Sequence, residues 1–169
     1  MMTRKSKTIG VISDTHGLLR PQALRALEGS ELIVHAGDVG DPDILAALKT
    51  IAPVFAVRGN VDTEVWAQDL PETEVVETDA ATIYVLHDLH ALDLDPVASG
   101  FHIVVSGHSH KPALADRAGV IYLNPGSAGP RRFDLPVSIA RVDLSKTPWE
   151  IKFLDLSGAA PKYFEPRWT

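Results

Sequence analysis

The stretch that decides the fold is Ile-Gly-Val-Ile-Ser-Asp-Thr-His-Gly, at positions 9–17. It begins as a short apolar run and ends in a polar loop that contains an aspartate and a histidine. The following segment, 21–28, has proline at its first position and apolar residues on one helical face. A buried strand, a polar loop and a helix in this order are typical of α/β proteins. We predict a strand over 9–13 and a helix over 21–28.

The same alternation of short apolar runs and helix-like segments continues to about the middle of the chain. Asp41 is expected to cap a second helix over 42–49, because a carboxylate before a proline-led helix accepts a backbone hydrogen bond. A hairpin turning at Asp79-Ala80 and a short helix over 91–99 are predicted next. The predicted strands of this half are 32–35, 53–57, 74–78, 81–86 and 103–106.

The second half contains apolar or alternating segments and no further helical pattern. The segments 120–123, 137–142 and 150–154 predict a second, mostly antiparallel sheet packed on the first. No repeat or linker interrupts the chain, so we expect one domain over 1–169. The aromatic-rich tail, 157–169, is interpreted as a segment strapped to the fold or contacting a partner, or as an ordinary terminus.

Composition excludes several classes of function. The net charge of −6 argues against a sequence-independent nucleic-acid coat or a protein of anionic membrane surfaces, since both need basic patches. The chain has no cysteine, which excludes disulfides, thiolate metal sites and cysteine nucleophiles. Its apolar runs are far shorter than a membrane span, and the basic start at 1–7 does not resemble a signal peptide. Because we recognise no targeting signal in the sequence, we expect a cytoplasmic protein.

Nearly every predicted strand is followed by a residue that can bind a metal ion. The carboxyl ends of parallel strands share one edge of a sheet, so we expect these residues to meet there. Glycine stands beside most of them, as required where backbone approaches an ion or an anion closely. The seven candidates are Asp14, His16, Asp38, Asn60, His87, His108 and His110.

The chemistry of these side chains indicates the kind of metal and its use. Carboxylate, amide and imidazole ligands suit Mn²⁺, Fe, Zn²⁺, Ni²⁺ or Co²⁺ better than Ca²⁺ or Mg²⁺ alone. Seven ligands exceed one catalytic site and fit two ions, about 3.5–4 Å apart, that share a bridging carboxylate. Such a pair would bind a phosphate and supply a bridging hydroxide as the nucleophile.

The chain resembles the calcineurin-like metallophosphoesterases, and among them the small YfcE-type phosphodiesterases. The resemblance covers most of the chain and rests on ordered blocks: SDTHG at 13–17, HAGDV at 35–39, RGNVD at 58–62, LHD at 86–88, SGHSH at 106–110 and NPGS at 124–127. It implies a two-sheet α/β sandwich flanked by helices and hydrolysis of phosphodiesters or phosphomonoesters. Two divalent ions are implied, with Mn²⁺ expected and Ni²⁺, Zn²⁺, Fe or Mg²⁺ as alternatives.

The resemblance also implies a division of the ligands. Asp38 would bridge the two ions, and Asn124 and Ser127 would support the site without being catalytic. The first ion would take Asp14, His16, Asp38 and His110, and the second Asp38, Asn60, His87 and His108.

Two positions depart from the family pattern. Val61 occupies the place where larger members have a histidine thought to protonate the leaving group, which leaves no evident general acid. Asp88 replaces the usual glycine and is interpreted either as a partner of His87 or as a charge that repels phosphate. His90 is a rival ligand at helical spacing from His87.

Few basic residues are available to hold a substrate. Arg58, beside Asn60, is the favoured contact, and Asn60 is expected to touch substrate as well as metal. Arg131 and Arg132 are interpreted either as further contacts or as solvated surface charges.

The leading hypothesis is a binuclear metal-dependent phosphodiesterase that acts on a small phosphate ester by in-line attack of a metal-bridging hydroxide. The alternative is a non-catalytic protein-binding scaffold of the same fold, as in a retromer subunit that resembles it. The hypothesis includes no membrane partner, and a nucleic-acid substrate is disfavoured because no basic, aromatic surface is evident. A homo-oligomer is compatible with the sequence.

Overall fold

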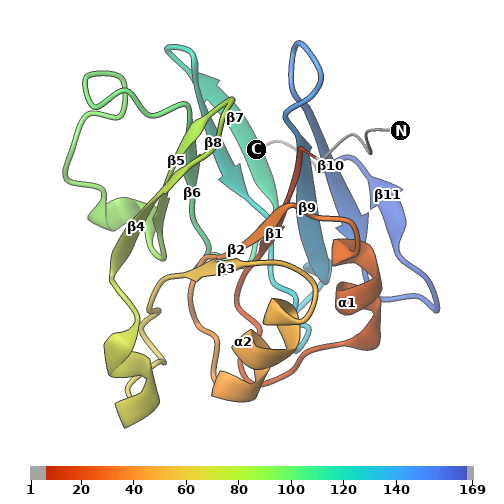
Figure 1. The fold of residues 1–169 in the computed structure, drawn as a ribbon. Helices are drawn as coiled ribbons and strands as arrows, with labels where there is room; N and C mark the ends of the chain where they lie inside the picture. The colour runs from red at the N-terminus through yellow and green to blue at the C-terminus, as the bar shows by residue number, and fades with distance from the viewer. Residues whose placement is uncertain (1–6, 167–169) are drawn as a thin grey trace.

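Two β-sheets pack face to face in the computed structural model, which describes residues 7–166 (Figure 1). The first sheet has six strands in the order β11-β10-β9-β1-β2-β3. Parallel pairing joins β1, β2 and β3, and the other three strands pair antiparallel. The strands are β1 (Thr8–Ile12), β2 (Leu32–His35), β3 (Val54–Ala56), β9 (Ser138–Asp143), β10 (Glu150–Asp155) and β11 (Lys162–Phe164).

The second sheet has five strands in the order β4-β5-β6-β8-β7. The predicted hairpin is confirmed as the antiparallel pair β4–β5, and β5, β6 and β8 run parallel. These strands are β4 (Thr73–Glu77), β5 (Thr82–Leu86), β6 (Ile103–Val105), β7 (Ala113–Arg117) and β8 (Val120–Asn124).

The main core lies between the two sheets. Alternate residues of each strand face it, as the two-residue period of a strand requires. Ile9 and Val11 come from the first sheet, and Val85 and Val105 come from the second. All four are nearly inaccessible to solvent, so the strands that precede the predicted ligands are held rigidly against one another.

Two helices cover the outer face of the first sheet (Figure 1). They are α1 (Pro21–Leu27) and α2 (Pro42–Lys49), and both begin with proline as predicted. The Asp41 carboxylate accepts a hydrogen bond from the Asp43 backbone N–H at 2.9 Å, which confirms the predicted cap. Leu27 and Leu48 pack against Ile12 on the sheet, so this face alone is covered by α-helices.

The outer face of the second sheet is covered by an irregular segment. The helix predicted over 91–99 is wrong: the chain forms a short 3₁₀ turn, η2 (Leu89–Ala91), and then hydrogen-bonded turns. The Asp95 carboxylate accepts from the Val97 N–H at 2.9 Å, and Pro96 has no N–H to donate, so side-chain and turn hydrogen bonds replace the helical ones. Leu92 and Phe101 nevertheless pack on this face of the sheet.

The predicted division of strands between the sheets is also wrong. β9 pairs antiparallel with β1, with Ile9 opposite Val142, and β10 follows it into the first sheet. β8 joins the second sheet in parallel with β6, so neither sheet is purely of one type. An alternating apolar pattern shows that a strand has a buried face, but it does not specify the strand's neighbour.

Three smaller elements were not predicted: β7, β11 and the 3₁₀ helix η1 (Val65–Asp69). β11 pairs with β10, with Phe164 opposite Phe153, so the described part of the tail is strapped to the sheet. Residues 167–169 of that tail, and 1–6 of the basic start, lie outside the described residues. Within 7–166, no helix is both long and apolar enough to cross a membrane.

His35, at the end of β2, links the loops that follow β1 and β2. Its Nδ1 accepts from the Gly37 N–H at 3.2 Å, so the ring proton is assigned to Nε2, which lies 3.0 Å from Thr15 Oγ1. The Thr15 hydroxyl in turn donates to the Val39 carbonyl at 2.8 Å. Burial disfavours the charged imidazolium and lowers the pKa of His35 to about 4, although nearby carboxylates oppose the shift.

This neutral buried histidine predicts an acid sensitivity of the fold. The pKa of His35 is lower in the folded protein than its ordinary value of 6.5, so the unfolded chain binds a proton first as the pH falls. Stability should be lost between about pH 6.5 and about pH 4, and the contribution of His35 should be about 3 kcal/mol. His35→Gln, whose amide can both accept from Gly37 and donate to Thr15, should lack this contribution.

The measurement is the unfolding free energy in urea at about pH 7.5 and about pH 4.5, with chelator present throughout so that metal loss does not contribute. The wild type should lose more stability than His35→Gln on acidification. An equal loss in the two proteins would contradict a buried, neutral His35.

Candidate metal centre

The seven predicted ligands follow the ends of five strands, and these strands belong to both sheets. Asp14 and His16 follow β1, Asp38 follows β2, and Asn60 follows β3 a few residues on. His87 follows β5, and His108 and His110 follow β6. The expectation that all seven share the edge of one sheet is therefore wrong. The packed sheets present the carboxyl ends of their parallel strands at the same end of the sandwich, where the two sets of loops meet.

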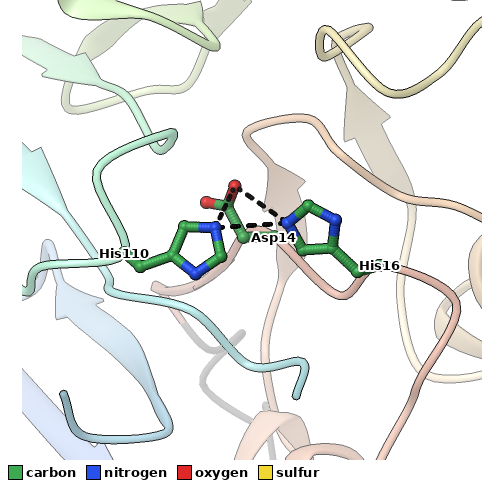
Figure 2. Close-up of side chains that lie close together, drawn as sticks. All are labelled: Asp14, His16 and His110. Carbon is green, nitrogen blue, oxygen red and sulfur yellow. Dashed lines mark hydrogen bonds and ion pairs between the residues drawn. The ribbon is translucent and has the colours of Figure 1, made fainter. Parts of the chain in front are cut away.

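Asp14, His16 and His110 form a tight cluster (Figure 2). Asp14 Oδ1 lies 3.3 Å from His110 Nε2 and 3.7 Å from His16 Nε2. The two imidazole nitrogens lie 3.2 Å apart. Three atoms that could bind a metal ion, one from each residue, thus face a common point.

Asp38 and His87 form the centre of an adjoining cluster. Asp38 Oδ2 lies 3.2 Å from His87 Nε2 and 3.6 Å from His16 Nε2. The amide oxygen of Asn60 lies 3.0 Å from His87 Nε2. His87 Nδ1 lies 2.7 Å from the Ala36 carbonyl, which can only accept, so Nδ1 carries a proton and Nε2 is the nitrogen turned toward Asp38 and Asn60.

The two clusters share the Asp14 carboxylate. Asp14 Oδ1 lies 4.0 Å from His87 Nε2, and His16 Nε2 lies within 4 Å of both carboxylates. Asp14, Asp38 and His87 together have donor atoms close enough to hold a second ion. Asp38 faces a histidine of each cluster, which is the position that a bridging carboxylate requires.

Each carboxylate uses one oxygen to hold the loops and leaves the other facing imidazoles. Asp14 Oδ2 accepts from Ser13 Oγ at 2.7 Å and from the His108 N–H at 3.1 Å. Asp38 Oδ1 accepts from the Val61 N–H at 3.0 Å. Asp14 Oδ1 is fully buried and has no hydrogen-bond partner. An ionised oxygen in this state is costly unless a cation binds it, so the residues present fit a metal.

The electrostatics of the site keep these acids ionised. Burial raises the pKa of Asp14, but the His110 and His16 imidazoles and the Ser13 hydroxyl outweigh it and hold that pKa well below its usual range. Burial likewise opposes ionisation of Asp38, yet His87 and the Val61 N–H keep its pKa lowered. Burial lowers the pKa of His87, but the contacts with Asp38 and Ala36 raise it overall.

The backbone at the site adopts conformations that few side-chain-bearing residues adopt. Five of the seven predicted ligands have positive φ, between 46° and 69°, in the left-handed region. These five are Asp14, His16, Asp38, His108 and His110. Each costs on the order of 1–2 kcal/mol relative to ordinary backbone, and such residues cluster where structure serves function. The tight loops turn these side chains inward.

Glycine permits the loops to approach the carboxylates themselves. A Cβ on Gly59 would overlap the Asp38 carboxylate, and one on Gly107 would overlap Ser13 Oγ beside Asp14. The sequence interpretation placed these glycines against an ion or anion. The structure places them against the acidic side chains.

His108 lies at the open side of the site. Its side chain is 45% exposed, its ring centre is 5.2 Å from that of His87, and its Nε2 is 3.9 Å from Asp88 Oδ2. Asp88 therefore faces His108 rather than His87, and its other oxygen contacts His90 Nδ1 at 3.2 Å. The His90 side chain is 98% exposed, and His90 belongs to neither group of candidate metal-binding residues found in the described chain.

The two residues predicted to support the site contact its loops, whereas the arginine predicted to bind substrate is paired with a glutamate. Asn124 donates to the Gly107 carbonyl at 2.9 Å, and Ser127 donates to the Asp14 carbonyl at 2.9 Å, so both contact the site loops as expected. The Arg58 guanidinium is paired with Glu72, with Nη2 and Oε1 2.9 Å apart. Its contact with substrate stays a prediction.

The sequence interpretation missed Asp62. Its buried carboxylate accepts from the backbone N–H groups of Val39, Gly40 and Gly59 at 2.9–3.1 Å, which fastens the Asp38 loop to the Asn60 loop. Its place in the block at 58–62 was the available signal. An aspartate after a strand is ordinarily a turn former, and only the fold shows that this one is buried.

Comparison with known proteins places the chain among enzymes and other proteins of one fold. The family model described as the calcineurin-like phosphoesterase superfamily domain matches residues 8–147. A probable metallophosphoesterase from Methanothermobacter thermautotrophicus is 36% identical over 156 residues, which is 85% of this chain and 90% of that protein. Phosphodiesterase YfcE of Escherichia coli is 28% identical over 162 residues, covering 78% of this chain and 84% of YfcE.

Solved structures share the same architecture. Wild-type Vps29 from Entamoeba histolytica, crystallised in complex with Zn²⁺, superposes with a TM-score of 0.74 at 25% identity. The match covers 93% of this chain and 97% of that one. The two mixed sheets, the match of the family model to most of the chain and the 36% identity to a probable metallophosphoesterase show that this chain belongs to the calcineurin-like phosphoesterase superfamily.

Proposed function

We propose that the protein is a binuclear metal-dependent phosphodiesterase that hydrolyses a small phosphate ester. The observation that carries the proposal is the buried Asp14 Oδ1, which accepts no hydrogen bond and faces imidazole nitrogens of His16, His110 and His87. Relatives named phosphodiesterase support the choice of reaction.

We assign the ligands to the two ions as the family resemblance implies. Asp14, His16, Asp38 and His110 would hold one ion, and Asp38, Asn60, His87 and His108 the other. The contact of Asp38 Oδ2 with both His16 and His87 supports its role as the bridge. Nitrogen and oxygen donors without sulfur suit Mn²⁺, our expected ion, and also Ni²⁺, Zn²⁺ and Fe.

Two divalent ions at this site would lower the pKa of water enough to supply a hydroxide nucleophile and would neutralise charge on the phosphoryl oxygens. The chain's part is to keep Asp14 and Asp38 ionised, to turn His87 Nε2 toward Asp38, and to fix all three in position. Two carboxylates against two ions leave a positive centre for an anionic substrate, although the protein carries a net charge of −6.

Protonation of the leaving group has no evident donor beside Asn60. Val61 stands there, and its backbone N–H is already bonded to Asp38. We therefore expect the protein to favour esters whose leaving groups depart without a proton, such as nitrophenolate, over alkyl esters.

The test of this function uses bis(4-nitrophenyl) phosphate and 4-nitrophenyl phosphate with protein stripped by chelator. Turnover should be absent without metal, should return with Mn²⁺, and should be faster for the diester than for the monoester. Ni²⁺, Zn²⁺ and Mg²⁺ are supplied separately to rank the ions. Absence of turnover with every ion, together with absence of metal binding, would favour the alternative of a non-catalytic scaffold.

Asp38→Asn tests the bridging role. The amide keeps the shape but removes the charge shared by both ions, so both should be lost together and turnover should fall by at least about a hundredfold. Metal content per chain, measured by mass spectrometry after gel filtration, and turnover are the two readouts. Asp93→Asn, at an exposed carboxylate that belongs to neither candidate metal group, is the matched control and should keep both properties. An Asp38→Asn protein that retains two ions and full turnover would contradict the proposal.

His108→Ala and His110→Ala test the division of ligands. Each should lower the metal content from about two ions per chain to about one, because each histidine is assigned to a different ion. His90→Ala is the control and should keep about two ions, since that side chain faces solvent and Asp88. Loss of an ion from His90→Ala would restore His90 as a ligand and overturn the assignment.

A further inference from the structure

A cavity of about 490 Å³ adjoins the candidate metal centre, and its lining differs in chemistry from the centre itself. His108 and His110 form the wall nearest the centre. Ser109, Lys111 and the loop at 132–135 form the rest. This volume lies within the range of small-molecule sites, about 300–1,000 Å³.

Phe133 is the most unusual residue of this cavity. Its side chain is 92% exposed, and its backbone is in the left-handed region with φ of 51°. A phenylalanine gains from burial and rarely adopts this backbone conformation, so folding of the chain alone does not account for its position. Leu135 adds a partly buried apolar surface to the same cavity. An aromatic ring held in water beside a reaction centre offers a surface on which a flat ligand can stack.

Two cations line the same cavity. Neither the Lys111 ammonium nor the Arg132 guanidinium forms a hydrogen bond or ion pair with any residue in the described range 7–166. Asp134 is the acidic side chain of the lining, so the cavity carries a net positive charge within an acidic protein. These unpaired cations suit a ligand that is anionic as well as flat.

We infer that this cavity binds the aromatic substituent of an anionic substrate, and that the substrate class is a small phosphodiester bearing a nucleotide. The inference rests on the proposed function: with the scissile phosphate at the metal centre, one ester substituent extends past His108 and His110 and stacks on Phe133. Phe133 is then a specificity-determining residue. A single aromatic platform serves one base, so the ligand is a small nucleotide rather than a polynucleotide.

The test measures binding by calorimetry, using two phosphonates that cannot be hydrolysed. One is the AMP analogue with CH₂ in place of the ester oxygen, and the other is ethylphosphonate, which lacks a ring. Metal-loaded wild type should bind the AMP analogue about tenfold or more tightly than ethylphosphonate, as expected for base–aromatic stacking. Phe133→Ala should reduce that ratio to within about twofold, and Phe133→Tyr should preserve it.

Tyr163→Ala is the matched control, because Tyr163 is an exposed aromatic on β11, outside this cavity, and stacks against Lys152. It should leave the ratio unchanged. Equal affinity of the wild type for the two phosphonates, or an unchanged ratio in Phe133→Ala, would overturn the inference.

Turnover of bis(4-nitrophenyl) phosphate, measured in parallel, separates this inference from the proposed function. Turnover without discrimination between the phosphonates leaves the phosphodiesterase standing and rejects the subsite. Discrimination without turnover rejects the reaction and supports the nucleotide-binding cavity.

Discussion

The rest of the site depends on how Asp14 and Asp38 are held: in each carboxylate, one oxygen accepts hydrogen bonds from the loops and the other faces imidazole nitrogens. One oxygen of each accepts hydrogen bonds from neighbouring loops: Asp14 from Ser13 and His108, Asp38 from Val61. These bonds orient the carboxylates, so the second oxygen of each is turned toward imidazole nitrogens. Two buried anions this close would repel each other without a cation. The fold thus holds two carboxylates in an arrangement that a bound cation would stabilise.

Supporting residues transmit the rigidity of the sheets to these carboxylates. His35 and Thr15 tie the loop after β1 to the loop after β2, and Asp62 ties the latter to the loop after β3. None of the three contacts a substrate in our proposal. Their effect is positional, since an ångström of displacement at a metal ligand alters both affinity and chemistry. Three of the five predicted ligands with left-handed backbone, Asp14, His16 and Asp38, lie in the loops after β1 and β2.

The cavity beside the candidate metal centre lies on one side of it, next to His108 and His110. The candidate metal-binding groups lie where loops of both sheets meet, whereas Phe133, Lys111 and Arg132 lie to one side; within residues 7–166 the Lys111 and Arg132 side chains form no hydrogen bond or ion pair. A metal centre of the proposed kind would not be selective by itself, because any phosphate ester would offer it the same oxygens. Selectivity between esters must come from side chains that touch the rest of the substrate.

Much of the local structure was predictable from the sequence. Both α-helices, the cap at Asp41 and the hairpin β4–β5 followed from apolar periodicity and from turn and cap residues. The candidate ligands were recognisable because an aspartate or histidine beside glycine follows a strand repeatedly. The helix predicted over 91–99 failed because the apolar residues there pack on the sheet through turns that Asp95 and Pro96 favour.

What the sequence determined by itself is therefore both α-helices, every strand except β7 and β11, and the set of candidate ligands. Only the tertiary structure decided that β9 and β10 join β1, that β8 joins β6, and that the ligands come from two sheets. Strand pairing depends on contacts between residues far apart in the chain, which a local pattern does not encode. Burial of Asp62 and exposure of Phe133 are likewise properties of the packed molecule, because each depends on which distant segments cover that side chain.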